Sequence, residues 1–340
     1  MRAAVYYGKE QPLVIEEVSK PDIGPLDLLL KVSRCGICGS DVHFAQEQGV
    51  APGTVFGHEF SGVIEQLGSS AVGDFKVGDS VIALGGIPCG ECPACLNQAF
   101  AQCQSIGLIG CDVNFAGAYS EYVRVSSLAS LKVPESVDMS DAAVVEPLAV
   151  GLNAWRKVAP QAGADVLILG AGPIGLAMVK WARFFGAANV VLSEMVPSRM
   201  ERARQAGADL VLDAKQEKNP VEAMVRETGR SPTVIFECVG RPMLQHLFDI
   251  APHQSHLCLL GACMKSESIN ISTATLKDLS LTIPLGYGVE EFAFILDLLA
   301  REKMDTQPLI SDEISLNQVP EIFEALKQPN DHCKVIIDLT

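Results

Sequence analysis

Residues 166–175, VLILGAGPIG, decide the fold of the central part of this chain. Val166–Leu169 is a run of four large apolar residues, which is typical of a strand buried on both faces. Gly170–Gly175 then supplies a Gly-x-Gly-x-x-Gly turn, and residues 176–185 follow at helical spacing. A strand, a glycine-rich turn and a helix in this order predict the start of a parallel, doubly wound α/β sheet.

The alternation continues beyond this unit. Further strands are predicted at 189–193, 210–212, 233–236 and 256–260, with a charged helix at 198–205. Strands that alternate with helices favour a parallel sheet covered on both faces. Helices at 290–301 and near 319–326, and a last strand at 334–338, complete the C-terminal part.

The glycine turn has the pattern of a dinucleotide-binding loop. Gly170 would make the tight turn, Gly172 would let backbone amides approach a pyrophosphate, and Gly175 would let the helix pack closely. Pro173 and Ile174 lie at the predicted helix N-terminus, which attracts phosphate. We therefore predict that all five bind a cofactor, the alternative being an ordinary tight turn.

An acidic residue follows at the distance expected for ribose recognition. Glu194 lies nineteen residues after Gly175, at the end of the second predicted strand. A carboxylate there accepts hydrogen bonds from ribose hydroxyls and repels a 2′-phosphate, which favours NAD over NADP. Arg199 lies five residues further on and can accommodate a phosphate, so it weighs against this preference.

The N-terminal part has a different pattern. Residues 1–85 alternate short apolar runs, such as 28–32, 62–65 and 80–84, with turns rich in Gly, Pro and Asp. No helical period is sustained there, so we expect an irregular β-rich domain.

Four cysteines form a compact lobe within residues 88–105. Cys89, Cys92, Cys95 and Cys103 are spaced as Cys-x2-Cys-x2-Cys-x7-Cys. Gaps of two residues let neighbouring thiolates reach one tetrahedral zinc ion, whereas disulfides at that separation would be strained. Four sulfur ligands leave no open position, so we predict a structural zinc site; the alternative is a set of reduced thiols without a metal.

Composition limits the class of protein. The chain has 340 residues and a formal net charge of −15, which argues against a general nucleic-acid surface. The longest apolar stretch, 166–179, is broken by turn residues and is shorter than the ~20 residues of a membrane helix. Residues 1–7 lack the apolar core of a signal peptide, so we expect a cytoplasmic protein without a membrane partner.

A second metal site is predicted in the β-rich part. Candidate ligands lie in Cys38–His43, in Gly57-His58-Glu59 and at Glu146, and a Cys, a His and a carboxylate from these segments would form a zinc set that keeps one position open. Such an ion can polarise an alcohol oxygen at neutral pH. Alone, each of these residues has an ordinary structural explanation.

These motifs together resemble the zinc-dependent medium-chain alcohol dehydrogenase family, in the branch of sorbitol, threonine and 2,3-butanediol dehydrogenases. The resemblance is carried by Cys35–His43, Gly57–Gly62, the four-cysteine lobe, Glu146-Pro-Leu and Gly170–Gly175, in the family's order. It implies a GroES-like catalytic domain over 1–150, a Rossmann NAD-binding domain over 151–285, and a segment over 286–340 that returns to the catalytic domain. The active site would lie in the cleft between the domains.

The resemblance also implies roles for individual residues. Cys38 and His58 would hold the catalytic zinc, and it leaves open whether Glu59 or Glu146 is the acidic ligand. Ser40 and His43 match the family's proton-relay positions. The implied activity is hydride transfer from an alcohol to NAD, with two zinc ions per chain and a homodimer or homotetramer as the expected assembly.

The substrate is predicted from the residues expected to line the pocket. By position in the family these are Phe44, Phe56 and Phe115, with Leu285 and Tyr287 less firmly placed; the alternative is that these aromatic residues belong to the core. A mostly apolar set without Arg or Lys favours a secondary alcohol or vicinal diol, with a sugar alcohol second.

Two other classes are considered. One is a non-catalytic zinc-ribbon interaction protein on a Rossmann scaffold, although residues 85–110 contain no Lys or Arg. The other is a metal-free quinone-type reductase, which would not need Cys38, His58 or the cysteine lobe. The zinc content would separate the three classes: two ions per chain for the dehydrogenase, one for the zinc-ribbon protein and none for the quinone-type reductase.

Overall fold

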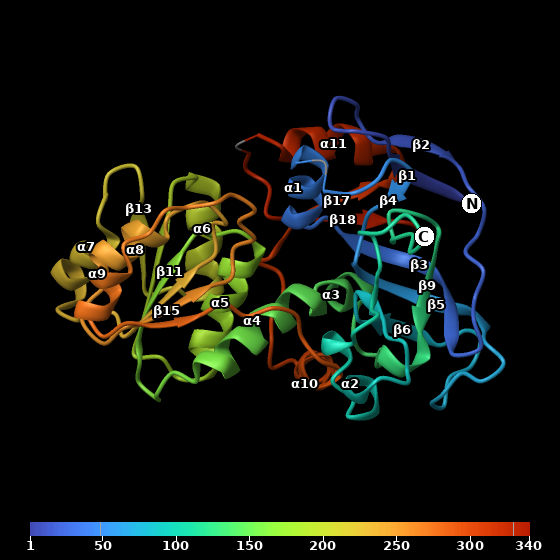
Figure 1. Cartoon of the computed structure of the whole chain (residues 1–340), viewed down its shortest axis with the longest axis horizontal. Coiled ribbons are helices and arrows are strands. Elements are labelled where there is room, and N and C mark those ends of the chain that lie inside the picture. Colours follow the sequence, from blue (N-terminus) through green and yellow to red (C-terminus); the bar gives the residue numbers. More distant parts are fainter. Residues whose placement is uncertain (48, 329) are drawn as a thin grey trace. The chain divides into compact units, whose positions relative to one another are not determined.

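The computed structural model describes residues 1–47, 49–328 and 330–340, which form two compact units. The first unit comprises Met1–Ala149, Tyr287–Thr306 and Ile310–Thr340, and the second comprises Val150–Gly286 and Gln307–Leu309. Figure 1 shows the helices and strands of both units.

The second unit contains a six-stranded parallel sheet. Its strands are β11 (Asp165–Leu169), β12 (Asn189–Glu194), β13 (Leu210–Asp213), β14 (Val234–Glu237), β15 (His256–Leu259) and β16 (Ser280–Thr282). They lie in the order β13-β12-β11-β14-β15-β16, with every neighbouring pair parallel. The order reverses beside β11, which is the switch point where doubly wound sheets bind ligands. The predicted fold class is confirmed, although β16, with only three residues, was not predicted.

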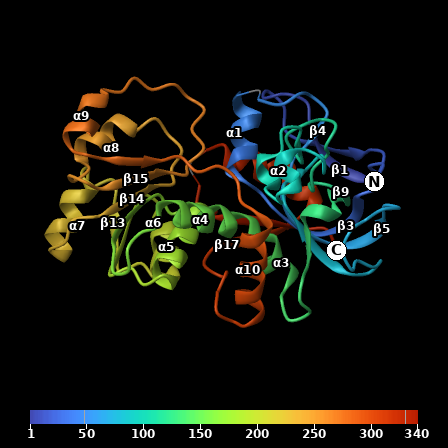
Figure 2. The ribbon, with the colours of Figure 1, turned by 60° about the horizontal axis from the view of Figure 1, so that its bottom comes forward.

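Helices cover both faces of this sheet. They are the greater part of α4 (Val145–Val158), α5 (Pro173–Phe184), α6 (Pro197–Ala206), α7 (Pro220–Thr228), α8 (Leu244–Ile250) and α9 (Ile271–Leu276). Figure 2 shows α8 and α9 on one face and α4, α5 and α6 on the other. The strand β11 is buried along its whole length between these layers, as its apolar run predicts.

The first unit is built mainly from antiparallel strands. One sheet has the order β2-β1-β4, from β1 (Arg2–Tyr6), β2 (Val14–Glu17) and β4 (Thr54–Val55). A larger sheet has the order β10-β6-β5-β3-β18-β17, with β9 also paired to β3. Its strands are β3 (Asp27–Gly36), β5 (Glu59–Leu67), β6 (Ser80–Ala83), β9 (Tyr122–Ser126), β10 (Ser130–Lys132), β17 (Ile310–Ser315) and β18 (Lys334–Asp338). A hairpin of β7 (Gly86–Ile87) and β8 (Gly107–Leu108) lies beside the cysteine lobe, which contains α2 (Pro93–Leu96).

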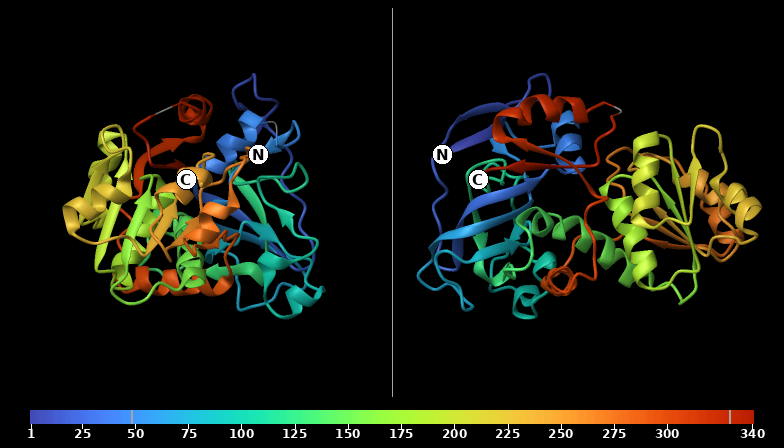
Figure 3. Two further views of the ribbon diagram at one scale, coloured as in Figure 1. Left: turned by 60° about the vertical axis from the view of Figure 1, so that its left-hand side comes forward. Right: turned by 180° about the vertical axis from the view of Figure 1, so that it is seen from behind.

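The two ends of the chain meet in this larger sheet. β18 pairs antiparallel with β3, with Ile337 opposite Cys35. Figure 3 shows from two further sides that the C-terminal strands lie among the N-terminal ones. The C-terminal part also contributes α10 (Val289–Ala300) and α11 (Val319–Leu326) to this unit.

The first unit is β-rich, as predicted, but it also contains short helices that the sequence pattern did not reveal. α1 (Gly39–Glu47) lies within residues 1–85, and α3 (Met139–Ala143) follows later in the unit. The buried residues of α1 are Asp41, Val42 and Ala45. With only two apolar residues and one carboxylate on its inner face, α1 has no hydrophobic period to detect.

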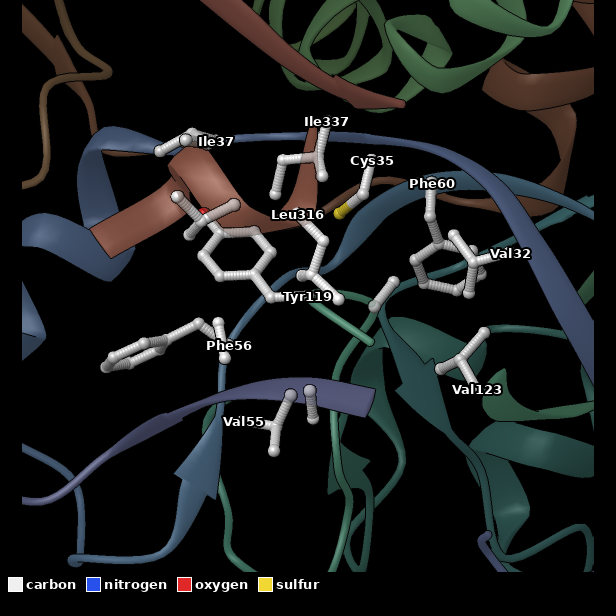
Figure 4. Packing of buried hydrophobic residues seen from close by; sticks show 14 of the residues in the cluster. Val32, Cys35, Ile37, Val55, Phe56, Phe60, Tyr119, Val123, Leu316 and Ile337 are labelled. Carbon is white, nitrogen blue, oxygen red and sulfur yellow. The ribbon is translucent and has the colours of Figure 1, made fainter. Parts of the chain in front are cut away.

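The core of the first unit gathers side chains from many strands. Figure 4 shows part of it, where Phe56 and Tyr119 lie among aliphatic side chains. Phe56 is fully buried, and its ring stacks on Phe323 with centroids 5.7 Å apart. This core packs under the segment that carries the predicted metal ligands.

Candidate functional site

The pairing of β3 with β5 brings the predicted metal ligands together. Cys38 lies in the link between β3 and α1, and His58 directly precedes β5. In the antiparallel register Gly36 lies opposite Glu59. The end of one strand therefore meets the start of the other, which places Cys38 beside His58 although twenty positions separate them in the sequence.

Three donors converge at this point. The ligand atoms of Cys38, His58 and Glu59 all lie within 4.8 Å of one another. A thiolate, an imidazole and a carboxylate form a donor set suited to zinc, and three protein ligands leave a fourth position open. Burial alone would lower the pKa of His58, but Asp41 and Cys38 raise it well above its usual value. The same negative surroundings favour a cation among these donors.

His58 faces a carboxylate on α1. Its Nδ1 lies 3.2 Å from Oδ1 of Asp41, whose side chain is fully buried. The other oxygen of Asp41, Oδ2, accepts a 2.7 Å hydrogen bond from the Tyr119 hydroxyl. Because Nδ1 faces Asp41, Nε2 is the nitrogen of His58 that is left for a metal.

Glu59 is bound on both oxygens by a buried cation. Nζ of Lys334, at the start of β18, lies 2.5 Å from Oε2 and 2.7 Å from Oε1 of Glu59, and it also donates to the carbonyl of Ile37. A Cβ at Gly36 would lie 2.3 Å from Oε2, so only glycine leaves room for this carboxylate. Burial alone would lower the pKa of Lys334, but Glu59 raises it above its usual range.

Glu146, the other acidic candidate, lies in the first turn of α4 and is buried. Burial raises the pKa of its carboxyl to about 7, with the charge of Glu59 as the second cause. Hydrogen bonding to Tyr287, which stacks on Phe292, opposes this shift. The carboxylate is thus near Glu59, but among the described residues it does not belong to the cluster of three donors.

The predicted relay residues lie on one helix. Ser40 and His43 are three residues apart on α1, so they share a face of the helix. The Ser40 hydroxyl lies 3.1 Å from Sγ of Cys38, and His43 is half-buried. This places Ser40 directly at the candidate metal ligands.

The predicted pocket residues are scattered. Phe56 belongs to the core, which is the alternative stated for the aromatic set. Phe44 packs partly buried against that core, and Phe115 lies under the guanidinium of Arg124 at 5.1 Å. Leu285 is 91% exposed, whereas Tyr287 is near Gly85 in the first unit.

The four cysteines of the lobe form a second cluster. The ligand atoms of Cys89, Cys92, Cys95 and Cys103 lie within 4.8 Å of one another. Sγ of Cys95 is 3.5 Å from that of Cys92 and 3.8 Å from that of Cys89. Sulfurs bound to one tetrahedral ion at ~2.3 Å are about 3.8 Å apart, so the cluster fits zinc.

The pKa values of two thiols in the lobe are shifted in opposite directions. Hydrogen bonds from the backbone amides of Cys95 and Gln104 lower the pKa of Cys92 to about 6. Burial raises the pKa of Cys95 to about 12. The turn that hosts the cluster requires Gly90, whose φ of +80° favours glycine.

The glycine turn has the geometry of a phosphate-binding loop. Gly170 has φ of +90°, and a Cβ at Gly175 would lie 1.9 Å from the carbonyl oxygen of Gly170. Gly172 caps α5, and a Cβ there would meet nothing within 4 Å. Pro173 and Ile174 are the first residues of that helix, so open space lies beside its positive end.

Glu194 ends β12 and is tied to this loop. Its Oε2 accepts a hydrogen bond from Ala171 N at 2.7 Å, and its Oε1 accepts from Met195 N and Val196 N. The carboxylate is therefore fixed at the carboxyl edge of the sheet, where a ribose is expected. Arg199 lies half-buried in the first turn of α6.

Three residues of the metal centre were missed in the sequence. Asp41 lies inside the quoted motif but was given no role, and Tyr119 carried no pattern at all. Lys334 had a detectable signal, because a lysine that starts the apolar strand Lys334–Asp338 needs a buried partner.

Comparisons with known proteins agree with this geometry. Residues 24–135 match the alcohol dehydrogenase GroES-like domain, and residues 173–301 match the zinc-binding dehydrogenase family. Sorbitol dehydrogenase of Bacillus subtilis is 30% identical, with 99% of this chain and 97% of that protein covered. Among the described residues no helix is long and apolar enough to cross a membrane.

Solved structures share the fold over the whole chain. Alcohol dehydrogenase TADH from Thermus sp. ATN1 superposes with a TM-score of 0.88 at 29% identity, covering 99% of both chains. An alcohol dehydrogenase from E. coli CFT073, solved with NADH, has a TM-score of 0.87 at 27% identity and covers 99% of both chains. The matched families account for the predicted GroES-like domain and zinc, and a neighbour with the same fold was solved with the predicted kind of dinucleotide; the chain belongs to the zinc-dependent medium-chain alcohol dehydrogenase family.

Proposed function

We propose that this protein oxidises a secondary alcohol or vicinal diol to the ketone, with NAD as the hydride acceptor. The observation that carries the proposal is the convergence of Cys38, His58 and Glu59 within 4.8 Å in a chain that also has a dinucleotide loop. A non-catalytic zinc-ribbon protein would need the four-cysteine lobe but has no use for this second donor set.

The residues of the chain divide the work between binding and proton transfer. When bound, zinc supplies a Lewis acid for the substrate hydroxyl, and NAD accepts the hydride. Cys38, His58 and Glu59 hold the metal, whereas Glu146 lies outside this set. Ser40, next to Cys38, takes the hydroxyl proton and His43 on the same face of α1 passes it towards solvent.

Charges near the site support an uncharged substrate. Lys334 is engaged by Glu59, and Arg124 beside Phe115 is engaged by Asp27 and by the carbonyl of Asp22. A phosphorylated or carboxylated substrate needs a cation that is not already paired. Lys334 beside Glu59 and Arg124 beside Phe115 are therefore both paired, which favours an alcohol or diol.

A sugar alcohol is the second candidate. The relative from Bacillus subtilis is named sorbitol dehydrogenase, and Glu146 and Tyr287 offer polar groups near the metal ligands. A polyol would use such groups for its additional hydroxyls.

A substrate panel tests the proposal. Short secondary alcohols, 2,3-butanediol, sorbitol and threonine are each assayed with NAD and with NADP at the absorbance of the reduced cofactor, and zinc per chain is measured. We expect two zinc ions, preference for NAD and highest kcat/KM with an alcohol or diol. Cys38→Ser should leave one zinc ion and no activity. A single zinc ion in the intact chain would refute the catalytic site, and activity confined to polyols would move the second candidate to first.

We also propose that the protein is a cytoplasmic homodimer or homotetramer that associates through β16. This strand is the edge of the six-stranded sheet, and Leu281, Ile283 and Leu285 along and beyond it are exposed. Edge pairing with a second copy would satisfy the open backbone groups and cover these side chains. Light scattering should show a dimer or tetramer, and Leu281→Arg with Ile283→Arg should give a monomer. A monomeric intact chain would refute this assembly.

A further inference from the structure

We propose that Tyr119 is a positioning residue for the catalytic metal, acting through Asp41 on the orientation of His58. This inference rests on the proposed zinc site. It concerns a tyrosine whose hydroxyl binds Asp41 instead of joining the cluster of Cys38, His58 and Glu59. Tyr119 is also distant in the sequence from the segments that carry these three residues.

The hydroxyl of Tyr119 donates a hydrogen bond to the Asp41 carboxylate, whose other oxygen has no hydrogen-bond partner among the described residues. Tyr119 Oη donates to Oδ2 at 2.7 Å, and Oδ1 faces Nδ1 of His58 at 3.2 Å. Asp41 and Tyr119 are both 0% exposed. Because water does not reach a fully buried carboxylate, its orientation depends on these two side chains.

Tyr119 is also fastened to the segment that carries His58. Its backbone amide donates to the carbonyl of Phe56 at 2.9 Å, and the amide of Ala118 donates to the carbonyl of Gly57 at 2.9 Å. The ring lies so close that a Cβ at Gly57 would be 2.5 Å from Cδ1 of Tyr119. Figure 4 shows the ring among the core side chains near Phe56 and Cys35.

Tyr119 thus bridges two segments that must keep a fixed separation. Its backbone and ring are fixed to residues 56–57, next to His58, and its hydroxyl is fixed to α1, which carries Asp41. Partners behind metal-bound histidines set the ring orientation, and their loss costs ~10–100-fold in metal affinity. Tyr119 is one step further from the metal, so we expect an effect near the lower limit.

The core offers a matched control. The Tyr6 hydroxyl is also buried, donating to the carbonyl of Ala45 at 3.1 Å, and both tyrosine rings contact Phe56. Tyr6→Phe and Tyr119→Phe each remove one buried hydroxyl from the same cluster. Only the second removes a donor from Asp41.

The experiment measures zinc release from the full-length, zinc-loaded chain into a colorimetric chelator. Cys38→Ser identifies the phase that belongs to the catalytic site, and the remaining phase belongs to the four-cysteine lobe. We expect Tyr119→Phe to accelerate the catalytic phase by roughly tenfold and to leave the other phase unchanged. Tyr6→Phe should change neither phase.

A double-mutant cycle shows whether the effect passes through Asp41. Asp41→Ala should accelerate the catalytic phase, and adding Tyr119→Phe to it should have little further effect, because the hydroxyl then has no carboxylate to hold. Equal rates for Tyr119→Phe and the unaltered chain would overturn the proposal, as would equal acceleration by Tyr6→Phe or full additivity with Asp41→Ala. The comparison of the two tyrosine variants decides the question even where Asp41→Ala does not fold. If the unaltered chain released no zinc in either phase, the proposed function itself would be refuted.

Discussion

Replacing Lys334 by methionine should destabilise the first unit strongly. Lys334 and Glu59 are each 1% exposed, and the ammonium is 2.5–2.7 Å from both carboxylate oxygens. Lys334→Met keeps the length of the side chain but, as long as no zinc is bound, leaves Glu59 as a buried charge without a partner. Breaking such a pair on one side costs about 3–5 kcal/mol.

The magnitude translates into a measurable change of melting temperature. The first unit has about 200 residues. For domains of that size 1 kcal/mol corresponds to ~2–4 °C, so the transition should fall by roughly 6–20 °C. Calorimetry follows it directly, since Trp155 and Trp181, the two tryptophans of the chain, lie in the second unit and do not report on it.

Two further measurements separate the charge effect from loss of packing. The pair Glu59→Met with Lys334→Met should recover most of the loss, because an apolar pair of similar volume often replaces a buried ion pair without cost. Added zinc should reduce the loss in Lys334→Met, since a cation bound by Glu59 compensates its charge. Lys132→Met, which breaks the partly exposed pair with Asp79, should change the melting temperature much less. If the double variant is as unstable as Lys334→Met, or if the single variant melts within about 2 °C of the intact protein, the charge reasoning is wrong.

Three other predictions concern the remaining parts of the site. Glu194→Gln removes the charge that repels a 2′-phosphate and keeps only one of the two oxygens that accept backbone amides. The preference for NAD over NADP in kcat/KM should therefore fall about tenfold, and an unchanged ratio would contradict the assignment. Cys95→Ser, in the buried part of the lobe, should lower the zinc content by about one ion per chain and reduce the melting temperature, whereas unchanged zinc would mean that the four thiols do not hold a metal. His43→Ala should slow turnover about tenfold to hundredfold near neutral pH, and added base should partly restore it. The zinc content should not change. If the variant matches the intact enzyme at every pH, His43 does not belong to the relay.

The Rossmann sheet was predictable because its determinants are local. An apolar run such as Val166–Leu169 can be buried only between two layers, and the glycine turn that follows fixes the connection to α5. Glu194 was placed at the end of its strand by the same local pattern. The helix α1 was missed because its inner face carries Asp41, whose burial is satisfied by partners that are distant in the sequence.

Only part of the cluster of Cys38, His58 and Glu59 could be predicted from local sequence, and that it holds zinc stays a prediction. Cys38 and His58 belong to short motifs, which can be recognised from the sequence alone. The choice between Glu59 and Glu146 depends on the register of β3 against β5, which no local pattern specifies. Phe56 was assigned to a pocket by family position, whereas the packing of Tyr6, Tyr119 and Phe323 around it places it in the core.

The charges at the centre explain why its surroundings come from so many segments. Asp41 and Glu59 are buried carboxylates, and each would cost several kcal/mol without partners. Their partners lie on other segments: Tyr119 is 78 residues from Asp41, and Lys334 is 275 residues from Glu59. The partners that hold Asp41 and Glu59 are in place only where β18 is paired with β3 and residues 118–119 are paired with 56–57. The same contacts thus stabilise the first unit and position the candidate metal ligands. A substitution at Tyr119 or at Lys334 should therefore affect both stability and metal binding.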